Sequence, residues 1–163
     1  MSDFDYIEEF NTAQAQSWVE MPELGDRARI LVRPSTEQGN PAYFNAMLRT
    51  SGKRARNLAR KGTISVADLE KNRLEDRELF PKFVITHWEF LEKGSDRGKP
   101  EAEKEYVQFS RDAATELCQK LPPHLFDRIR NHAATEENFY PDDEIPPDAT
   151  ELAGNSENVS SGS

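Results

Sequence analysis

Residues 27–34, with the sequence RARILVRP, carry the clearest strand pattern in the chain. Ala28, Ile30 and Val32 alternate with longer side chains, and a period of two residues is typical of a strand with one buried face. Residues 18–20 lead into a turn that contains Pro and Gly and that precedes this strand. The two segments therefore predict a β-hairpin. Because a lone hairpin is only marginally stable in water, we expect it to pack against the helices that follow.

Capping residues mark where the predicted helices begin. Asn40 and Pro41 suit the N-cap and first position of a helix, and Ser65 with Asp68 resembles a second capped start. Ser110 is the N-cap of a third helix, which a pair of prolines at 122–123 separates from a last helix running to residue 140. The fold class predicted is mostly α (α+β), an N-terminal hairpin followed by about four helices.

The most regular apolar pattern lies at residues 80–91. Counted from Phe80, the pattern continues three, four, seven, eight and eleven residues later, which is the spacing of one helix face. Pro81 lies inside this segment, where proline either kinks a helix or restarts it, and Gly94 would end it. We expect the face to belong to the core, and it consists of Phe80, Phe83, Val84, His87, Trp88 and Leu91.

The net negative charge is concentrated at the two ends of the chain. The first ten residues and residues 141–163 carry ten acidic residues and no basic one, so residues 11–140 have a net charge of +1 within a total of −9. Residues 141–163 are also rich in Pro, Ser and Asn, a composition that cannot bury enough apolar surface to order itself. We therefore predict an acidic, flexible N-terminus (1–13), one domain (14–140) and a disordered acidic tail (141–163).

No pattern in the chain indicates catalysis. His132 and Glu136 have helical spacing that suits two metal ligands, but no Cys/His cluster supplies the remaining ligands of a site. There is no signature of an activated nucleophile and no phosphate-binding glycine loop. No apolar run reaches the length of about 20 residues that crosses a bilayer, and the single Cys118 suits a reducing compartment. We expect no enzymatic activity, no cofactor, no metal and no membrane association.

The segment from Arg49 to Lys61 is strongly basic. It holds six positive charges and no acid, but no aromatic residues alternate with them to stack on bases. A solvated helix face, or one that docks an acidic surface, is therefore expected rather than nucleic-acid binding. The predicted basic surface consists of Arg49, Lys53, Arg54, Arg56, Arg60 and Lys61.

The order of these features resembles the tail assembly chaperones of long-tailed, siphovirus-type bacteriophages. The resemblance begins with the tryptophan-led hairpin that ends in ILVR and continues with the helix opening at residues 40–43 and a basic middle. Further matching features are Trp88, which lies six residues before Gly94, and the pair Phe109-Ser110, which precedes a helix ending in leucine-proline. A last helix that closes in residues 138–139 also matches. A polar tail completes the pattern.

The resemblance implies a non-catalytic protein of the host cytoplasm that is absent from the mature virion. It implies that the chain binds the tape measure protein, keeps its apolar helices soluble and helps recruit tail tube subunits. It also implies a longer product made by ribosomal frameshifting, and it leaves a homo-oligomer open. Because such a chaperone needs apolar grooves, the candidate partner-binding residues are Tyr43, Phe44, Met47, Leu48, Phe126 and Ile129.

Two other functions remain open at this point. One is a small nucleic-acid-binding regulator that uses the basic residues 49–61, for which charge contacts alone would give a steep salt dependence. The other is a structural head-tail connector protein. A connector would be present in purified particles, whereas a chaperone would not.

Overall fold

The structure is a computed structural model that describes residue 3 and residues 15–52, 54, 56 and 64–140. The chain divides into two units, Thr12–Phe139 and a second one made of Met1–Asn11 with Tyr140–Ser163. The description that follows concerns the larger unit. The predicted acidic tail and nearly all of the predicted acidic N-terminus lie outside the described residues and stay predictions.

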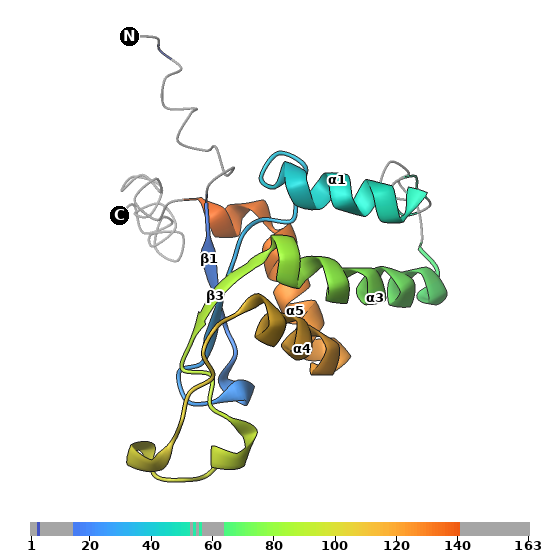
Figure 1. Ribbon diagram of the computed structural model, residues 1–163. Helices are drawn as coiled ribbons and strands as arrows, with labels where there is room; N and C mark the ends of the chain where they lie inside the picture. The colour runs from blue at the N-terminus through green and yellow to red at the C-terminus, as the bar shows by residue number, and fades with distance from the viewer. Residues whose placement is uncertain (1–2, 4–14, 53, 55, 57–63, 141–163) are drawn as a thin grey trace, which may run out of the picture. The chain divides into compact units, whose positions relative to one another are not determined.

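The larger unit is an α+β fold, which confirms the predicted class. The strands β1 (Ser17–Glu20), β2 (Arg29–Val32) and β3 (Ile85–Glu89) form an antiparallel sheet in the order β1-β2-β3. The described α-helices lie to one side of it (Figure 1). They are α1 (Pro41–Thr50), α3 (Val66–Phe83), α4 (Arg111–Lys120) and α5 (Pro123–Ala134).

The predicted hairpin forms as expected. β1 and β2 pair with Val19 opposite Ile30, and both side chains are buried. Gly25 in the connecting segment has φ +142°, a value that favours glycine, and a Cβ there would lie 3.0 Å from the backbone oxygen of Phe90. The connection therefore requires glycine both for its conformation and for its close approach to the chain that follows β3.

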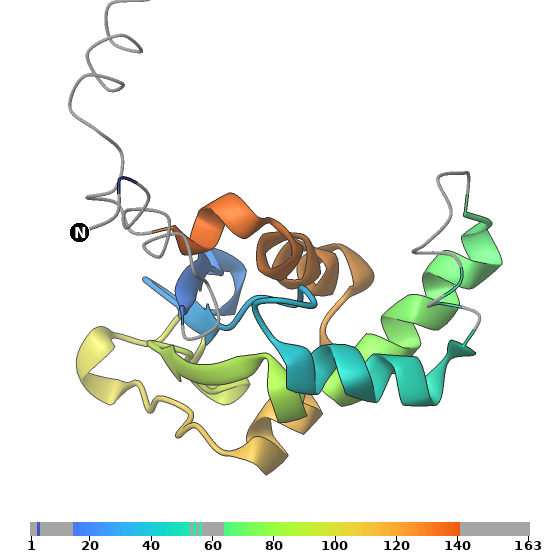
Figure 2. The same ribbon diagram turned by 90° about the horizontal axis from the view of Figure 1, so that it is seen from above.

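The predicted helix starts are also confirmed. Asn40 accepts a hydrogen bond from the Tyr43 amide (3.2 Å), and Ser65 and Ser110 accept equivalent bonds at the starts of α3 and α4. The Asn40 side chain also donates to the carbonyl of Phe83 (2.8 Å). One residue thus caps α1 and ties its start to the end of α3, and the two helices extend away from the sheet side by side (Figures 1 and 2).

The prediction of a continuous helix across residues 80–91 is wrong. α3 continues through Pro81 but ends at Phe83, and β3 then pairs with β2, with Trp88 opposite Ile30 and Ile85 opposite Val32. The register shifts between these two pairs, so the strand contains an extra residue, as in a β-bulge. Ile85 and Trp88 are therefore both buried although they are three residues apart, a separation that imitates a helix turn.

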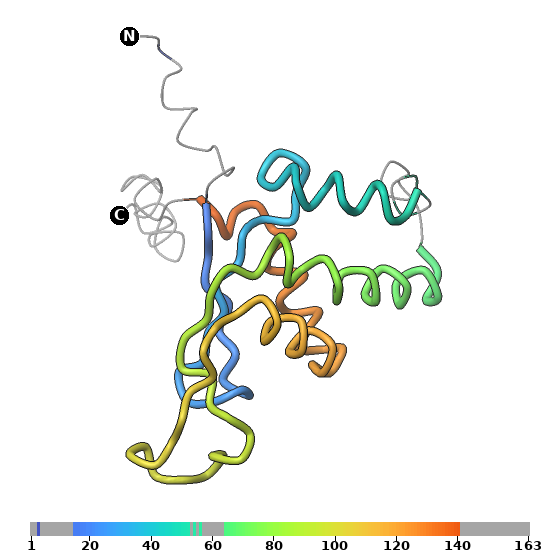
Figure 3. The backbone as a smooth tube through the Cα atoms, viewed as in Figure 1, coloured from blue at the N-terminus to red at the C-terminus, as the bar shows by residue number. Residues whose placement is uncertain are grey.

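Two smaller expectations also need correction. Gly94 does not end a helix but begins a short 3-10 turn in the long connection between β3 and α4, which Figure 3 shows leaving the sheet and returning to it. The last α-helix stops at Ala134 instead of continuing to residue 140. A 3-10 turn at Glu136–Phe139 follows it and buries Phe139.

The core fills the space between the sheet and the helices. The Phe80 ring lies at its centre and makes edge-to-face contacts with Tyr43 and Phe126, both with centroids 5.6 Å apart. Trp88 reaches the same core from β3 and is only 4% exposed. Its indole nitrogen donates to the carbonyl of Val107 (2.8 Å), and its ring packs on Phe109 at 4.9 Å.

Replacing Trp88 by alanine should therefore destabilise the fold by about 3–5 kcal/mol, because the large cavity that results cannot collapse fully. Urea denaturation followed by circular dichroism measures the loss. Trp18→Ala is the matched control, since Trp18 lies on the solvent-facing side of the sheet and should cost much less. An equal loss from both substitutions would contradict the placement of Trp88 in the core.

Candidate docking pocket

An apolar pocket of about 350 Å³ opens between α4, the segment after β3 and the short turn that precedes Gly25. Its volume is at the small end of the range for ligand pockets. Its apolar lining comes from four separate segments of the chain. We call this site the docking pocket, and its apolar residues are Leu24, Trp88, Leu91, Val107, Ala113 and Leu117.

One wall of the docking pocket is a face of α4. Ala113, Glu116, Leu117 and Lys120 follow one another at spacings of three, one and three residues, so they lie on the same side of the helix. The neighbouring face of α4 is buried in the core through Ala114 and other small or apolar residues. Core packing therefore fixes the orientation of the helix and presents this wall to solvent.

The opposite wall is held by backbone and indole hydrogen bonds. The Val107 amide donates to the carbonyl of Leu91 (2.8 Å), and the carbonyl of Val107 accepts from Trp88. These bonds join the two arms of the connection between β3 and α4 where they leave the sheet. Leu91 and Val107 are thus placed side by side, with the buried indole beneath them.

Charged side chains stabilise the connection beyond this wall. The carboxylate of Glu92 lies 2.9 Å from the ammonium of Lys104, and this contact raises the pKa of Lys104 above its usual value. Asp96 accepts a hydrogen bond from the Glu105 amide (2.7 Å) and one from Lys99 (3.1 Å), which together lower the pKa of Asp96. The contacts of Glu92 with Lys104 and of Asp96 with the Glu105 amide join opposite arms and so hold the segment in shape.

The docking pocket has an apolar floor and charged residues at its margin. Its floor is aliphatic and aromatic, while its charged lining residues are Glu92, Arg97, Glu116 and Lys120, two of each sign. No serine, cysteine or histidine is among its lining residues. Such a surface can bury one apolar side chain of a partner and contact charges that flank it on either side.

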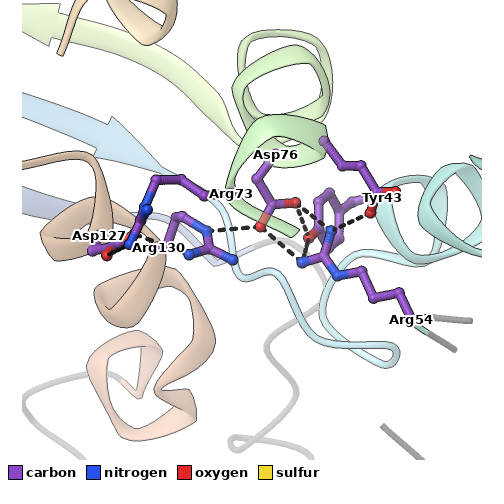
Figure 4. Close-up of polar contacts among 7 residues, drawn as sticks. Tyr43, Arg54, Arg73, Asp76, Asp127 and Arg130 are labelled. Carbon is purple, nitrogen blue, oxygen red and sulfur yellow. Dashed lines mark hydrogen bonds and ion pairs between the residues drawn. The ribbon is translucent and has the colours of Figure 1, made fainter. Parts of the chain in front are cut away.

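A second polar cluster lies in the interior and is centred on Asp76 of α3 (Figure 4). The Asp76 carboxylate is 2% exposed and accepts from the Tyr43 hydroxyl (2.6 Å) and from Nε of Arg130 (2.8 Å). The Arg54 guanidinium binds both carboxylate oxygens, at 2.9 and 2.8 Å. Arg130 also donates to Asp127, which Arg73 binds in turn.

The hydrogen-bonding capacity of the Asp76 carboxylate is filled by protein groups. Each oxygen of Asp76 already accepts two hydrogen bonds from protein groups, so the carboxylate has no site left for a substrate. Burial and the charge of Asp76 raise the pKa of Tyr43 far above its usual value, so the phenol stays protonated. Burial alone would lower the pKa of Arg54, but its pairing with Asp76 raises it.

The six candidate partner-binding residues fall into two groups. Tyr43, Met47, Phe126 and Ile129 are buried in the core and have no surface to offer a partner. Phe44 is half-buried against the core, and Leu48 is 40% exposed. The structure therefore brings four of the six together, but as core residues and not as a groove.

The candidate basic surface is likewise divided. Arg54 is buried in the Asp76 cluster, so its expected placement on the surface is wrong. Arg49 and Arg56 are exposed, as expected. Lys53, Arg60 and Lys61 lie outside the described residues.

The histidines do not form a metal site in the described part of the chain. No group of three His, Cys, Asp or Glu residues is placed to hold an ion there. His87 was expected on the core face, but it is exposed on β3, where side chains alternate and its neighbour Trp88 points inward instead. Burial lowers the pKa of His132, whose Nε2 lies 2.9 Å from the hydroxyl of Ser17. Burial raises the pKa of the Cys118 thiol to about 12, so the thiol remains neutral.

The docking pocket was not predicted from the sequence as a site. Trp88 and Leu91 were recognised as members of the apolar stripe. Leu24 and Val107 belong to short turns and loops, where no periodic pattern draws attention to them. Both residues lie at the docking pocket because of the path of the long connection between β3 and α4, which only the three-dimensional structure shows.

Comparison with known protein families, curated proteins and solved structures finds no match for this chain. Of the helices that the structure describes, none combines the length and the apolar character needed to cross a membrane.

The Asp76 cluster leads to a specific expectation for stability. Arg54→Met should cost roughly 3 kcal/mol, because the substitution leaves a buried carboxylate with one fewer positive partner. The matched control is Arg56→Met, two residues away and exposed, which should change stability by less than about 0.5 kcal/mol. Chemical denaturation of both variants gives the comparison, and equal stabilities would show that Arg54 does not occupy the interior.

Proposed function

We propose that this chain is a phage tail assembly chaperone that binds and solubilises the tape measure protein and helps recruit tail tube subunits, without catalysis. The proposal rests on the ordered sequence features that resemble this family. The docking pocket is the structural observation that supports it best. An apolar floor with charges of both signs suits reversible binding of a partly apolar helix.

The partner segment that fits the docking pocket is an amphipathic helix. One apolar side chain would enter the space between α4 and Leu91, where 350 Å³ is available. Polar side chains one turn away on the partner helix would then face the pair of opposite charge at Glu116 and Lys120, and the exposed Arg97. Burying a single large apolar side chain contributes about 1.5–3 kcal/mol.

Weak binding at each site is what this function requires. A chaperone that coats a long apolar helix has to be displaced later, when the tail tube forms around that helix. Many weak contacts along one tape measure protein give strong overall binding through repetition, while each copy remains removable. A small, open pocket suits this behaviour better than a deep one would.

The two alternative functions are distinguished by specific observations. For a nucleic-acid regulator, the pairing of Arg54 with Asp76 removes one cation from the basic segment and weakens that alternative. For a head-tail connector, mass spectrometry of purified particles is decisive, since a connector is a virion component. The chaperone should be needed for tail assembly in the infected cell yet absent from the finished particle.

Ala113→Leu tests the role of the docking pocket directly. The added branched side chain should fill part of the pocket, and binding to the tape measure protein should weaken about tenfold or more. Co-expression followed by co-purification, with the soluble fraction of the tape measure protein as a second readout, measures the effect. Ala67→Leu on the exposed start of α3 is the matched control and should leave both readouts unchanged.

Two outcomes would contradict this proposal. The pocket assignment fails if Ala113→Leu folds normally and still binds as well as the control. The chaperone function itself fails if the unaltered chain neither co-purifies with the tape measure protein nor raises its solubility. Polar substitution of Met47 is not a suitable test, because Met47 is 2% exposed and its replacement would disrupt the core.

A further inference from the structure

The charged residues at the margin of the docking pocket differ in whether a partner already neutralises them. The Glu92 carboxylate lies 2.9 Å from the Lys104 ammonium, and both side chains are largely buried. On α4, the carboxylate of Glu116 binds the ammonium of Lys120 at 3.1 Å, one helix turn away. Each of these two pairs has no net charge, so neither pair favours an acidic partner over a basic one.

Arg97 is the exception at this margin. Its side chain lines the docking pocket, is exposed, and makes no ion pair with any residue that the structure describes. Two neighbouring cations of the same connection are already bound. Lys93 pairs with Glu105. Lys99 pairs with Asp96. Arg97 therefore gives the margin of the pocket one positive charge that is available to a partner.

Hydrogen bonds hold the backbone around Arg97 in place. The Asp96 carboxylate accepts from the Glu105 amide (2.7 Å), which ties this turn to the opposite arm of the connection. The Arg97 amide donates to the carbonyl of Gly94 (3.3 Å). The Lys99 amide donates to the carbonyl of Asp96 (3.0 Å). Because the backbone is already fixed, less conformational entropy is lost when the guanidinium binds a partner.

We propose that the docking pocket selects a partner helix that carries an acidic residue one turn from its apolar anchor, and that Arg97 binds this acidic residue. The inference rests on the proposed function, in which the pocket receives an apolar helix. Side chains three or four residues apart on a helix have Cβ atoms about 5–6 Å apart. When the anchor enters between Leu91 and Leu117, an acidic side chain at this spacing lies at the margin that Arg97 lines.

Charge decides between acidic and basic partner helices. A basic residue at the same position would be repelled by Arg97, and the two neutral pairs at the margin would not offset this repulsion. The rest of the domain does not oppose an acidic partner, because residues 11–140 carry a net charge of only +1. An exposed ion pair contributes about two- to fivefold in affinity, and salt weakens it. Attraction of one partner and repulsion of the other should together separate their affinities by about tenfold.

Two matched peptides test this selectivity. Each is an alanine-rich helix of about 20 residues with one leucine anchor. The residues four positions before and after the anchor are glutamate in one peptide and lysine in the other. The chain has two tryptophans, so two indole N–H signals report on binding in NMR spectra of the full chain. Trp88 reports on the pocket that it lines, and Trp18, on the solvent-facing side of the sheet, is the internal reference.

The glutamate peptide should shift the Trp88 signal at about one-tenth of the concentration that the lysine peptide requires. Arg97→Glu should reverse this order, because the variant attracts lysine and repels glutamate. Lys71→Glu makes the same change of charge at an exposed position of α3 and should leave the order unchanged. Ala113→Leu should weaken binding of both peptides, because it fills part of the pocket.

Equal affinities for the two peptides overturn the proposal, and so does an order that Arg97→Glu fails to reverse. If neither peptide shifts the Trp88 signal at millimolar concentration, the pocket does not receive an apolar helix and the proposal is wrong. Circular dichroism establishes that the variants fold. Arg97→Gln is the second variant, and it should remove the preference between the peptides without reversing it.

The same measurements distinguish other occupants of the pocket. If the full chain self-associates in sedimentation equilibrium and Ala113→Leu abolishes the association, the pocket receives a second copy and the proposal is overturned. If the peptides bind in the expected order but the chain does not co-purify with the tape measure protein, the chaperone function fails and the selectivity of the pocket remains. Co-purification without any preference between the peptides overturns only the selectivity.

Discussion

The carboxylate of Asp76 is buried on α3, and a buried charge is tolerated only when opposite charges and hydrogen bonds replace the water it has lost. Tyr43, Arg54 and Arg130 provide these partners, and they come from α1, from the basic segment and from α5. Segments that precede and follow α3 in the sequence must therefore converge on one point of this helix. This requirement sets how the helices lie relative to one another, with the Phe80 ring packed between Tyr43 and Phe126.

The sheet and the docking pocket follow from the position of α3. Because α3 ends at Phe83, where Asn40 binds its last carbonyl, the chain enters β3 directly and pairs with β2. Trp88 is thereby buried, and its bond to Val107 fixes the long connection that forms one wall of the pocket. The inner side of the sheet thus serves the core, while the docking pocket remains open to solvent.

Sequence patterns predicted where helices begin better than they predicted which side chains are buried and which are exposed. Capping at Asn40, Ser65 and Ser110 depends on neighbouring residues and was predicted correctly. The stripe at residues 80–91 was misassigned, because it joins the end of α3, which stops at Phe83, to residues of β3 such as Trp88, and the helical spacing across this junction is a coincidence. An apolar residue on a helix has the same spacing whether it faces a core or a groove, which is why Tyr43 and Phe126 were taken for a binding surface. Arg54 looked like a surface charge because its partner is 22 residues away.

We propose that the docking pocket, rather than another apolar surface, receives the apolar helix of a partner. Methyl NMR of the full chain, titrated with a peptide from an apolar helix of the tape measure protein, tests this claim most directly. The largest shift changes should occur at the methyl groups of Leu24, Leu91, Val107 and Leu117. Changes concentrated at the exposed Leu48 and Leu69, or no changes at all, would contradict it.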